Sequence, residues 1–371
     1  MSPQRSWNWQ QTNWPYFTYD PEPFAALEHS FIESSGRLLG LSQHVDEENT
    51  TQLMIEALSQ EALTTSEIEG EFLNRDSVQA SLRRRFGLAS DHRRIPPAEE
   101  GISELLMDLL KNYSQELTHE QLFRWHAMLM KGRRDLDFIG AYRTHDEPML
   151  IVSGHVNEPN IHFEAPPSRK VKGEMDQFLS WFASTGPRGT IRMNLLVRAS
   201  LVHLYFVCIH PFEDGNGRIA RALVTRALAE SLGRFTLLAL SETILLDRKR
   251  YYQMLELSNK SLAVQEWISY FAASLCTAQQ HSIESCEFLI KKTKFFDRFR
   301  NQLNTRQLKL LDRIFREGPR GFEGGISAEK YINLTKTSRA TATRDLTELS
   351  NLGILQKTGV GKGTRYQLRL P

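Results

Sequence analysis

The residues best suited to chemistry lie in one run of the chain, from His210 to Arg221. His210 carries an imidazole that can accept a proton from a hydroxyl group, because the ordinary pKa of histidine lies near neutral pH. Asp214 is a carboxylate that can hold Mg²⁺, an ion that usually binds phosphate oxygens and one or two protein carboxylates together. A general base and a metal ligand four residues apart indicate transfer of a phosphate-linked group to a hydroxyl.

The same run supplies groups that bind anions. Gly215 and Gly217 flank Asn216, and glycine permits backbone conformations in which successive N–H groups turn toward one phosphate. Arg218 and Arg221 are three apart, so they share a helical face and can both reach that phosphate. An ordinary surface turn is the alternative interpretation. It does not account for the base, the carboxylate, the glycines and the arginines together.

Two apolar helices must position this run. Residues 193–209 are a long apolar stretch that predicts a buried helix, and residues 219–232 predict a second one. The run between them is therefore a loop and the first turn of a helix, where the helix dipole favours negative charge. We expect Phe212 to fix the loop to the core. His203 is interpreted as a helix residue, because no third metal ligand is near it.

The run resembles, without a mismatch, the signature of the Fic family, His-x-Phe-x-Asp/Glu-Gly-Asn-Gly-Arg-x-x-Arg. The resemblance implies an AMP transferase that modifies Ser, Thr or Tyr hydroxyls of target proteins, with ATP as donor and Mg²⁺ as cofactor. It implies that His210 is the base and that Asp214 holds the metal. The other nucleotide-binding residues that it implies in this run are Gly215, Asn216, Gly217, Arg218, Ile219, Ala220 and Arg221.

An upstream stretch, Thr65 to Gly70, has two interpretations. Taken alone, Ser66 and Glu69 have the spacing of a capping box at a helix N-terminus. Beside the Fic-like run, Thr65, Glu69 and Gly70 resemble the inhibitory motif of that family, Ser/Thr-x-x-x-Glu-Gly/Asn. A Glu69 carboxylate against Arg221 would occupy the guanidinium that the γ-phosphate needs, so we expect it to restrain the reaction.

Two further segments complete the expected nucleotide site. Residues 148–164 contain two β-rich runs joined by a turn and predict a hairpin. The resemblance makes this hairpin a flap that holds the target and covers the nucleotide, and an ordinary surface hairpin is the alternative. The flap residues are Ile151, Val152, Ser153 and Gly154. The residues that resemble the adenine and ribose contacts are Tyr251, Tyr252 and Asn259, with a core aromatic pair as the alternative.

The pattern of predicted elements and the charge of the chain both change after residue 303. Three predicted helices and a glycine-rich hairpin follow one another, in the order of a winged helix-turn-helix. From Thr305 onward, thirteen Lys and Arg stand against six Asp and Glu, a net charge of +7 in a chain of +2. This balance favours a DNA contact, and a winged helix used only for protein contacts is the alternative. The expected DNA-facing residues are Arg339, Thr341, Thr343, Arg344, Lys362 and Arg365.

The fold class expected is mainly α, with a Fic helical core, a hairpin flap and a C-terminal winged helix. The aromatic segment Trp7 to Tyr19 predicts a strap over apolar surface, and it resembles a domain of unknown function that precedes some Fic domains. The expected domains are residues 1–95 (helical, with the inhibitory motif at 65–70), 96–260 (Fic catalytic domain), 261–302 (helical linker) and 303–371 (winged helix).

Cellular context and partners follow from composition. Three cysteines without metal spacing, no signal-peptide pattern and no apolar run of membrane length indicate a cytoplasmic protein. A target protein docking on the flap is an expected partner, and a homodimer stays open. Two other functions remain: a DNA-binding regulator that senses nucleotide without turnover, and transfer of a different phosphate-linked group.

Overall fold

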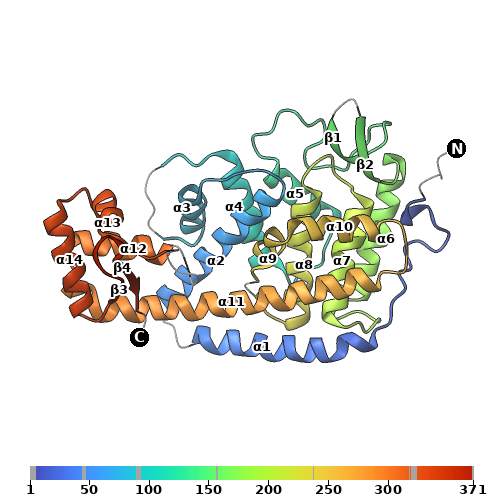
Figure 1. Cartoon of the computed structure of the whole chain (residues 1–371). Coiled ribbons are helices and arrows are strands. Elements are labelled where there is room, and N and C mark those ends of the chain that lie inside the picture. The colour runs from blue at the N-terminus through green and yellow to red at the C-terminus, as the bar shows by residue number, and fades with distance from the viewer. Residues whose placement is uncertain are drawn as a thin grey trace. The chain divides into compact units, whose positions relative to one another are not determined.

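The structure is a computed structural model that describes residues 6–43, 47–88, 93–155, 158–236, 238–316, 318 and 324–369. Within these residues the chain is mainly helical, as predicted, with two short antiparallel hairpins (Figure 1). It divides into two compact units. The first comprises Met1–Arg37 and Met54–Ser282, and the second comprises Leu38–Leu53 and Ile283–Pro371. Of the described helices, none combines the length and apolarity needed to cross a membrane.

The elements follow in chain order in Figure 1. The α-helices are α1 (Ala25–Gln43), α2 (Glu47–Ile68), α3 (Arg75–Arg85), α4 (Pro97–Asn112), α5 (His119–Leu129), α6 (Ser168–Ser184), α7 (Leu195–Ile209), α8 (Asn216–Leu232), α9 (Leu240–Leu246), α10 (Arg248–Ser258), α11 (Gln265–Phe299), α12 (Thr305–Arg316), α13 (Ala328–Thr335) and α14 (Arg339–Asn351). The strands are β1 (Leu150–His155), β2 (Glu158–Glu164), β3 (Leu355–Thr358) and β4 (Arg365–Leu368). Short 3-10 turns are η1 (Asn8–Gln10), η2 (Glu22–Phe24), η3 (Arg300–Gln302) and η4 (Gly361–Gly363).

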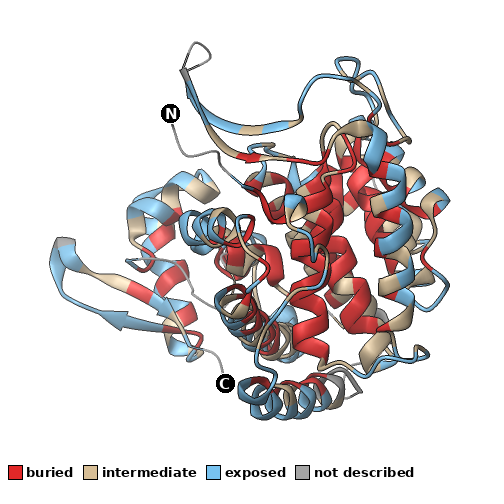
Figure 2. Cartoon of the chain, turned by 90° about the vertical axis from the view of Figure 1, so that its right-hand side faces the viewer, coloured by how far each residue is buried: buried red, intermediate tan, exposed pale blue. Residues whose placement is uncertain are grey.

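Helices α7 and α8 form the centre of the first unit. Fourteen of the fifteen residues of α7 are buried, as expected for a helix that is apolar on every side. Figure 2 shows the buried residues concentrated on the central helices, while outer helices expose one face. His203 lies inside α7, and its Nε2 is 3.0 Å from the hydroxyl of Tyr251, so it is a core residue, as interpreted from the sequence.

The two central helices begin differently. Asn194 caps α7, because its Oδ1 accepts hydrogen bonds from the N–H groups of Leu196 and Val197 at 3.0 and 3.2 Å. At the start of α8 stands Gly215, with a φ of 78° and no side chain that could cap the helix. The first N–H groups of a helix have no partner within the helix. The N-terminus of α8 is therefore open to an anion.

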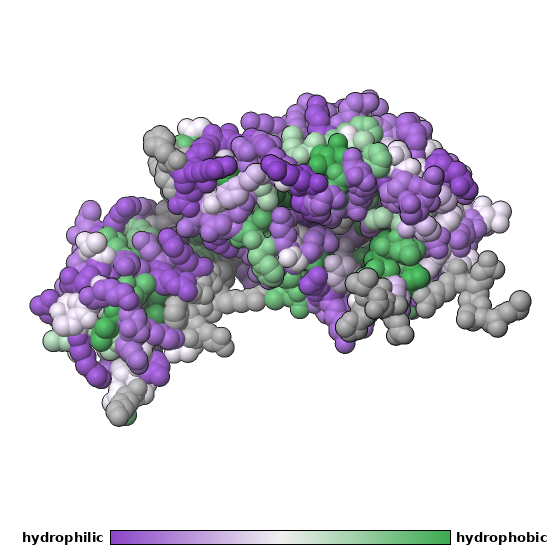
Figure 3. Space-filling model, turned by 90° about the horizontal axis from the view of Figure 1, so that it is seen from above, coloured by the Kyte–Doolittle hydropathy of each residue, from purple (hydrophilic) through white to green (hydrophobic). Residues whose placement is uncertain are grey.

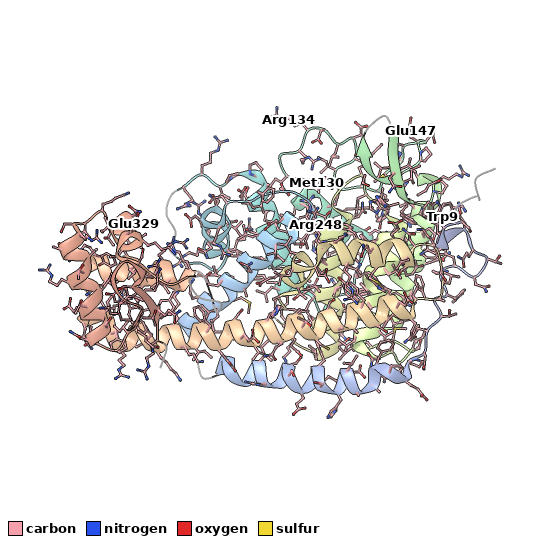
Figure 4. The ribbon with its side chains drawn as sticks, viewed as in Figure 1. Trp9, Met130, Arg134, Glu147, Arg248 and Glu329 are labelled. Carbon is pink, nitrogen blue, oxygen red and sulfur yellow. The ribbon has the colours of Figure 1, made fainter. Side chains whose placement is uncertain are left out.

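The N-terminal aromatic segment lies on apolar surface, as predicted. Trp7 is buried, and the N–H of Asn8 donates to the carbonyl of Asn259 at 2.8 Å. Trp9, labelled in Figure 4, donates through Nε1 to the carbonyl of Glu164 at 2.6 Å. The strap therefore contacts both the end of α10 and the end of β2.

The predicted hairpin at 148–164 is present as strands β1 and β2. Ile151 pairs with Phe163 and Val152 pairs with Ile161. One residue, His162, is therefore left over between these two pairs, which makes it the extra residue of a β-bulge. Phe163 belongs to the hydrophobic core of the first unit, Ile151 and Ile161 are partly buried and pack against that core, and Val152 is exposed.

The second unit contains the predicted three helices and hairpin, α12 to α14 followed by β3 and β4. An isolated bridge pairs Ile326 with Tyr366 of β4. Asp345 of α14 is buried. It accepts hydrogen bonds from Nε of Arg306 and from the hydroxyl of Tyr331, both at 2.8 Å. The ion pair with Arg306 and the hydrogen bond from Tyr331 together connect α12, α13 and α14 within the unit.

The surface is largely hydrophilic, with hydrophobic residues in separate patches, on the face that Figure 3 shows. Exposed large apolar side chains in the described chain include Phe72, Val152 and Val360. Single exposed apolar residues are normal for a folded protein, so none of them indicates a function alone.

Candidate active site

His210 ends α7 in a left-handed conformation, with a φ of 51° and a ψ of 59°. Its N–H donates to the carbonyl of Phe206 at 3.0 Å. A residue with a β-carbon adopts this conformation at a cost of about 1–2 kcal/mol, so surrounding contacts must hold it there. The conformation turns the chain sharply out of the central helix and into the loop.

Arg143 supplies those contacts. Its side chain is 1% exposed, and its Nε donates to the carbonyl of His210 at 2.8 Å. The same guanidinium donates to the carbonyl of Pro166 at 2.5 Å and to the hydroxyl of Ser168 at 2.8 Å. The backbone N–H of Arg143 also donates to the carbonyl of Pro211 at 3.0 Å. Sequence reasoning missed this residue, because only its burial distinguishes it from a surface arginine.

The imidazole of His210 is ready to accept a proton. Its Nδ1 lies 3.2 Å from the carbonyl of Val207, and a carbonyl only accepts, so Nδ1 carries the hydrogen. The lone pair is then on Nε2. Burial, assisted by the positive charge of Arg143, lowers the pKa of His210 to about 4. The ring is therefore neutral at pH 7, as a general base must be.

Asn216 shapes the loop after His210. Its Oδ1 accepts from the N–H of Phe212 at 3.0 Å, and its Nδ2 donates to the carbonyl of Phe212 at 2.8 Å. Phe212 is fully buried, as predicted, and its ring stacks on His126 with centroids 4.2 Å apart. Because the side chain of Asn216 is used inside the loop, only its backbone N–H is left for a phosphate.

Gly215 has a φ of 78°, a conformation that favours glycine, and both glycines of the loop lie close to the ends of neighbouring side chains. A Cβ on Gly215 would lie 2.7 Å from the Cε of Met130, which Figure 4 labels near the end of α5. A Cβ on Gly217 would lie 2.3 Å from Oε1 of Glu69 and 3.2 Å from NH1 of Arg221. The first turn of α8 thus lies directly beneath a carboxylate and a guanidinium. The next two side chains, Ile219 and Ala220, are buried in the core, so only their backbone can face a nucleotide.

Asp214 remains ionised beside this turn. Burial alone would raise its pKa, but Arg218, Arg133 and the N–H of Gly215 stabilise the carboxylate and hold the pKa below its ordinary value. Arg133 donates to Asp214 at 2.8 Å. In the described chain there is no cluster of three or more potential metal-ligating side chains. One carboxylate fits Mg²⁺ that is bound mainly by phosphate and water.

Arg221 is already paired with the upstream motif. Its side chain is 1% exposed, and NH2 donates to Oε1 of Glu69 at 2.9 Å. Nε donates to the hydroxyl of Thr65, and NH2 donates to the carbonyl of Thr65, each at 2.8 Å. Gly70 follows with a φ of 84°. The predicted contact between Glu69 and Arg221 is therefore present, with Thr65 in the same network.

The capping-box interpretation of this stretch is wrong. Helix α2 continues through Ser66 and ends at Ile68, so Ser66 does not begin a helix. The helix that follows, α3, is capped by Asn74, whose Oδ1 accepts from the N–H of Ser77 at 3.0 Å.

Arg218 is paired in the same way, with a residue that sequence reasoning missed. Its NH1 donates to Oε2 of Glu71 at 2.6 Å, and its NH2 lies 3.5 Å from Asp214. The spacing Glu69-Gly70-Glu71 was the available signal. One buried nitrogen of each arginine, Nε of Arg218 and NH1 of Arg221, lacks a hydrogen-bond partner among the described residues. Such orphaned donors fit an anionic ligand.

The residues predicted for adenine and ribose differ in accessibility. Tyr251 is 2% exposed, and its hydroxyl lies 3.0 Å from Nε2 of the buried His203, so the core interpretation fits it better. Tyr252 is 40% exposed, and its hydroxyl donates to the carbonyl of Ile68 at 3.3 Å. Asn259 is buried, and its Nδ2 donates to the carbonyl of His162 at 3.1 Å. Of the three, only Tyr252 presents an open ring.

The flap residues lie on β1, and the DNA-facing candidates lie in the second unit. Ser153 is exposed on β1, and Gly154 has a φ of 93°. In the second unit, Arg339, Thr343 and Arg344 are exposed on α14. The other described candidates there make local contacts: Thr341 with Ser338, and Arg365 with the carbonyl of Thr364. The side chain of Lys362 lies outside the described residues.

Residues 116–228, which contain His210 and the arginine pair, match the model of the Fic/DOC family. The chain carries a Fic/DOC domain. Residues 7–88 match a second family, a domain of unknown function called DUF4172. The aromatic strap, Thr65 and Glu69 lie in this second match, so the predicted domain before the Fic domain is confirmed.

Known proteins agree with the Fic assignment. Over 208 residues the chain is 24% identical to a protein adenylyltransferase Fic from Nematostella vectensis, and the alignment covers 55% of this chain and 44% of that protein. A Fic family protein from Desulfovibrio desulfuricans G20 has a similar structure, with a TM-score of 0.53, 19% identity and coverage of 96% and 98% of the two chains.

Two further solved structures share the fold. A Fic-domain protein from Bacteroides thetaiotaomicron gives a TM-score of 0.52 at 18% identity, covering 70% of this chain and 98% of that one. Fic-1 from C. elegans gives a TM-score of 0.51 at 21% identity, covering 72% and 74% of the two chains.

Proposed function

We propose that this Fic protein is a protein adenylyltransferase that uses ATP and Mg²⁺ to place AMP on Ser, Thr or Tyr hydroxyls of a target protein. The observation that carries the proposal is the neutral imidazole of His210 in the loop before the uncapped N-terminus of α8. The orphaned guanidinium nitrogens of Arg218 and Arg221 support a phosphate ligand. The adenylyltransferase name of the 24% identical relative supports AMP as the group.

The reaction follows from the positions of these groups. Nε2 of His210 takes the proton of the target hydroxyl while its oxygen attacks the α-phosphorus of ATP. The bond between the α- and β-phosphates breaks, and diphosphate leaves. Amides of the first turn of α8, together with Arg218 and Arg221, stabilise the negative charge that develops. Asp214 would hold Mg²⁺, which would offset the negative charge of the phosphates when bound.

Glu69 and Thr65 restrain this reaction in the proposal. The Glu69 carboxylate occupies NH2 of Arg221 and lies above Gly217. A triphosphate needs the same guanidinium, and its negative charge is repelled by the carboxylate. ATP therefore either displaces Glu69 or binds with its α-phosphate in an unproductive position. Glu69→Gly removes the carboxylate and leaves Arg221 available.

The test is label transfer from ATP labelled at the α-phosphate. Glu69→Gly should raise incorporation of AMP into protein, and adding His210→Ala should abolish it by removing the base. Mass spectrometry identifies the group, because AMP and phosphate differ in mass. Persistent transfer without His210, or addition of a group other than AMP, would refute the proposal.

The basic charge of the C-terminal unit supports a second candidate function, DNA binding by a winged helix. Three of its proposed contact residues are exposed on α14. In this proposal Arg339 and Arg344 contact DNA, and the Fic domain can act as a nucleotide sensor or as an enzyme. Arg339→Ala with Arg344→Ala should weaken DNA retention and reduce its salt dependence. Unchanged retention would exclude this face.

A further inference from the structure

The loop after α5 brings an arginine to the carboxylate of Asp214. NH1 of Arg133 donates to Oδ2 of Asp214 at 2.8 Å. The same guanidinium also holds Asp135, because its Nε donates to Oδ1 at 2.7 Å and its NH2 donates to Oδ2 at 2.6 Å. One cation therefore bridges two carboxylates, one on its own loop and one in the run from His210 to Arg221. Sequence reasoning singled out neither Arg133 nor Asp135.

Both carboxylate oxygens of Asp214 already meet donor groups. Oδ1 accepts from the N–H of Gly215 at 2.5 Å and lies 3.5 Å from NH2 of Arg218. Oδ2 is the oxygen that Arg133 binds. Mg²⁺ binds carboxylate oxygens directly, so an ion on this carboxylate would lie close to the guanidinium, and like charges at such a separation repel each other. Arg133 and a metal ion therefore compete for Asp214.

Asp135 offers the guanidinium a second place to bind. A carboxylate that meets two N–H groups of one arginine forms a bidentate pair, which is the strong form of this contact. Arg133 can thus give up its contact with Asp214 and keep the pair with Asp135. The side chains of Arg133, Asp135 and Asp214 are 38%, 64% and 37% exposed. Ion pairs that water screens in this way are weak, so the exchange costs little.

The loop has other contacts that hold it beside the phosphate site when this pair opens. Oε2 of Glu213 accepts from the N–H groups of Asp137 and Phe138 at 2.9 and 3.1 Å. The N–H of Gly140 donates to Nδ1 of the buried His126 at 3.0 Å. None of these bonds uses the side chain of Arg133. The movement therefore needs only one side chain, and the loop can stay in place.

We propose that Arg133 sets the affinity of the site for its metal ion, because it competes for Asp214 and withdraws to Asp135 when a divalent cation binds. The proposal rests on the function proposed above, in which Asp214 holds Mg²⁺ beside the phosphates of ATP. Before the ion binds, the guanidinium offsets the negative charge of Asp214, which would otherwise repel a triphosphate. Arg133 acts through Asp214 and is therefore a positioning residue.

Nucleotide binding with and without metal tests the competition. The probe is α,β-methylene-ATP, whose α- and β-phosphates are joined by a carbon that resists cleavage, and titration calorimetry measures its affinity for the Glu69→Gly chain. With Mg²⁺, Arg133→Met should raise the affinity about fivefold, the upper range for a water-screened ion pair. With EDTA in place of Mg²⁺, it should leave the affinity unchanged or lower it, because a positive charge near the phosphates is lost.

The opposite signs distinguish competition from a structural role. A variant that only displaces the loop would lower the affinity under both conditions, and that result would overturn the proposal. An unchanged affinity with Mg²⁺ would overturn it as well. Arg134, labelled in Figure 4, is exposed on the same loop. Arg134→Met is the matched control and should change neither affinity.

Asp135 should have the opposite effect to Arg133. Asp135→Asn weakens the second binding place, so Arg133 stays on Asp214 and the affinity with Mg²⁺ should fall by a similar factor. In the Arg133→Met chain the same change should have little effect, because no guanidinium is left to hold. An equal fall in both chains would show that Asp135 acts through its own charge, and the withdrawal to Asp135 would be wrong.

Asp214→Asn separates this proposal from the proposed function. Loss of the Mg²⁺ effect with Asp214→Asn, together with no gain from Arg133→Met, would reject the competition alone. An Mg²⁺ effect that does not depend on Asp214 would reject the metal assignment in the proposed function, and the competition with it. Failure of the Glu69→Gly chain to bind the nucleotide would reject both the adenylyltransferase function and the role of Arg133.

Discussion

Glu71 and Arg218 are joined by an ion pair at 2.6 Å, two residues along the chain from the pair of Glu69 with Arg221. Both arginines of the phosphate site thus meet a carboxylate from one short segment. The two pairs are alike in burial: Arg218 and Arg221 are 5% and 1% exposed, while their carboxylate partners are 37% and 28% exposed.

Replacing Glu71 should strengthen nucleotide binding only modestly. Glu71→Gln removes a charge that competes with phosphate. The carboxylate of this pair is in contact with water, and ion pairs screened by water are worth about 0.2–1 kcal/mol, or at most about fivefold in affinity. Titration calorimetry with ATP and with ADP measures this change. A gain with ADP as large as that with ATP would indicate that Arg218 binds a phosphate shared by both. Glu67→Gln is a matched control, and weaker binding by Glu71→Gln would contradict the prediction.

Arg143 should act on the base rather than on the nucleotide. Arg143→Lys keeps the positive charge but loses the planar guanidinium. The several N–H donors of that group reach the carbonyls of His210 and Pro166 and the hydroxyl of Ser168. A small displacement of the imidazole should lower kcat on the order of 100-fold, with little change in the KM for ATP. Initial rates in the Glu69→Gly background measure both. The exposed Arg134, changed to Lys, is the control, and a loss confined to KM would assign Arg143 to nucleotide binding instead.

Transfer should tolerate mild acid. The active ring of His210 is neutral, and its pKa is lowered from 6.5 to about 4, so about nine tenths of the chains keep the base free at pH 5. We expect kcat/KM to stay level from neutral pH to about pH 5 and to fall below it. A half-loss near pH 6.5 would show that the ring has an ordinary pKa in the free enzyme.

The lowered pKa of His210 also makes the stability of the fold depend on pH. Unfolded chains bind a proton at His210 below about pH 6.5, whereas the folded chain binds it only near pH 4. The folded state therefore loses stability as the pH falls through this window. Circular dichroism at each pH distinguishes that loss from loss of the base itself.

Asp345 should stabilise the second unit alone. Asp345→Asn weakens its contacts with Arg306 and Tyr331, at a cost of about 1–3 kcal/mol. All six tryptophans precede residue 283, so their fluorescence reports the first unit, while circular dichroism reports both. In urea titrations, Asp345→Asn should lower the urea concentration at which circular dichroism reports unfolding of the second unit. The unfolding curve from tryptophan fluorescence should stay unchanged. The exposed Asp312, changed to Asn, is the control, and a matching shift in fluorescence would contradict independent unfolding.

Local sequence patterns predicted the central helices and the loop between them. The apolar stretch before His210 predicted α7, and the glycines after it predicted the open start of α8. These two features depend on neighbours in the sequence, which periodicity and spacing reveal. The pairing of Glu69 with Arg221, 152 residues apart, was expected only because the stretch around Glu69 resembles the inhibitory motif of the Fic family.

The features that were missed depend on contacts across the fold. Arg143 meets His210 from 67 residues away, and Glu71 meets Arg218 from 147 residues away. His162 is the extra residue of a β-bulge, and only the pairing of β1 with β2 defines that bulge. A single sequence gives no signal for such distant partners, since an arginine or a glutamate is usually a surface residue.

The network of Thr65 and Glu69 around Arg221 affects how fragments of this protein should be interpreted. The segment that matches Fic/DOC starts at residue 116, so a fragment cut to that match would lose the network and the aromatic strap together. The guanidinium of Arg221 would be uncovered, and the hairpin of β1 and β2 would lose the contact from Trp9. Under the proposed function, rates measured on such a fragment would describe an unrestrained protein, and the resting activity has to be measured on the intact chain.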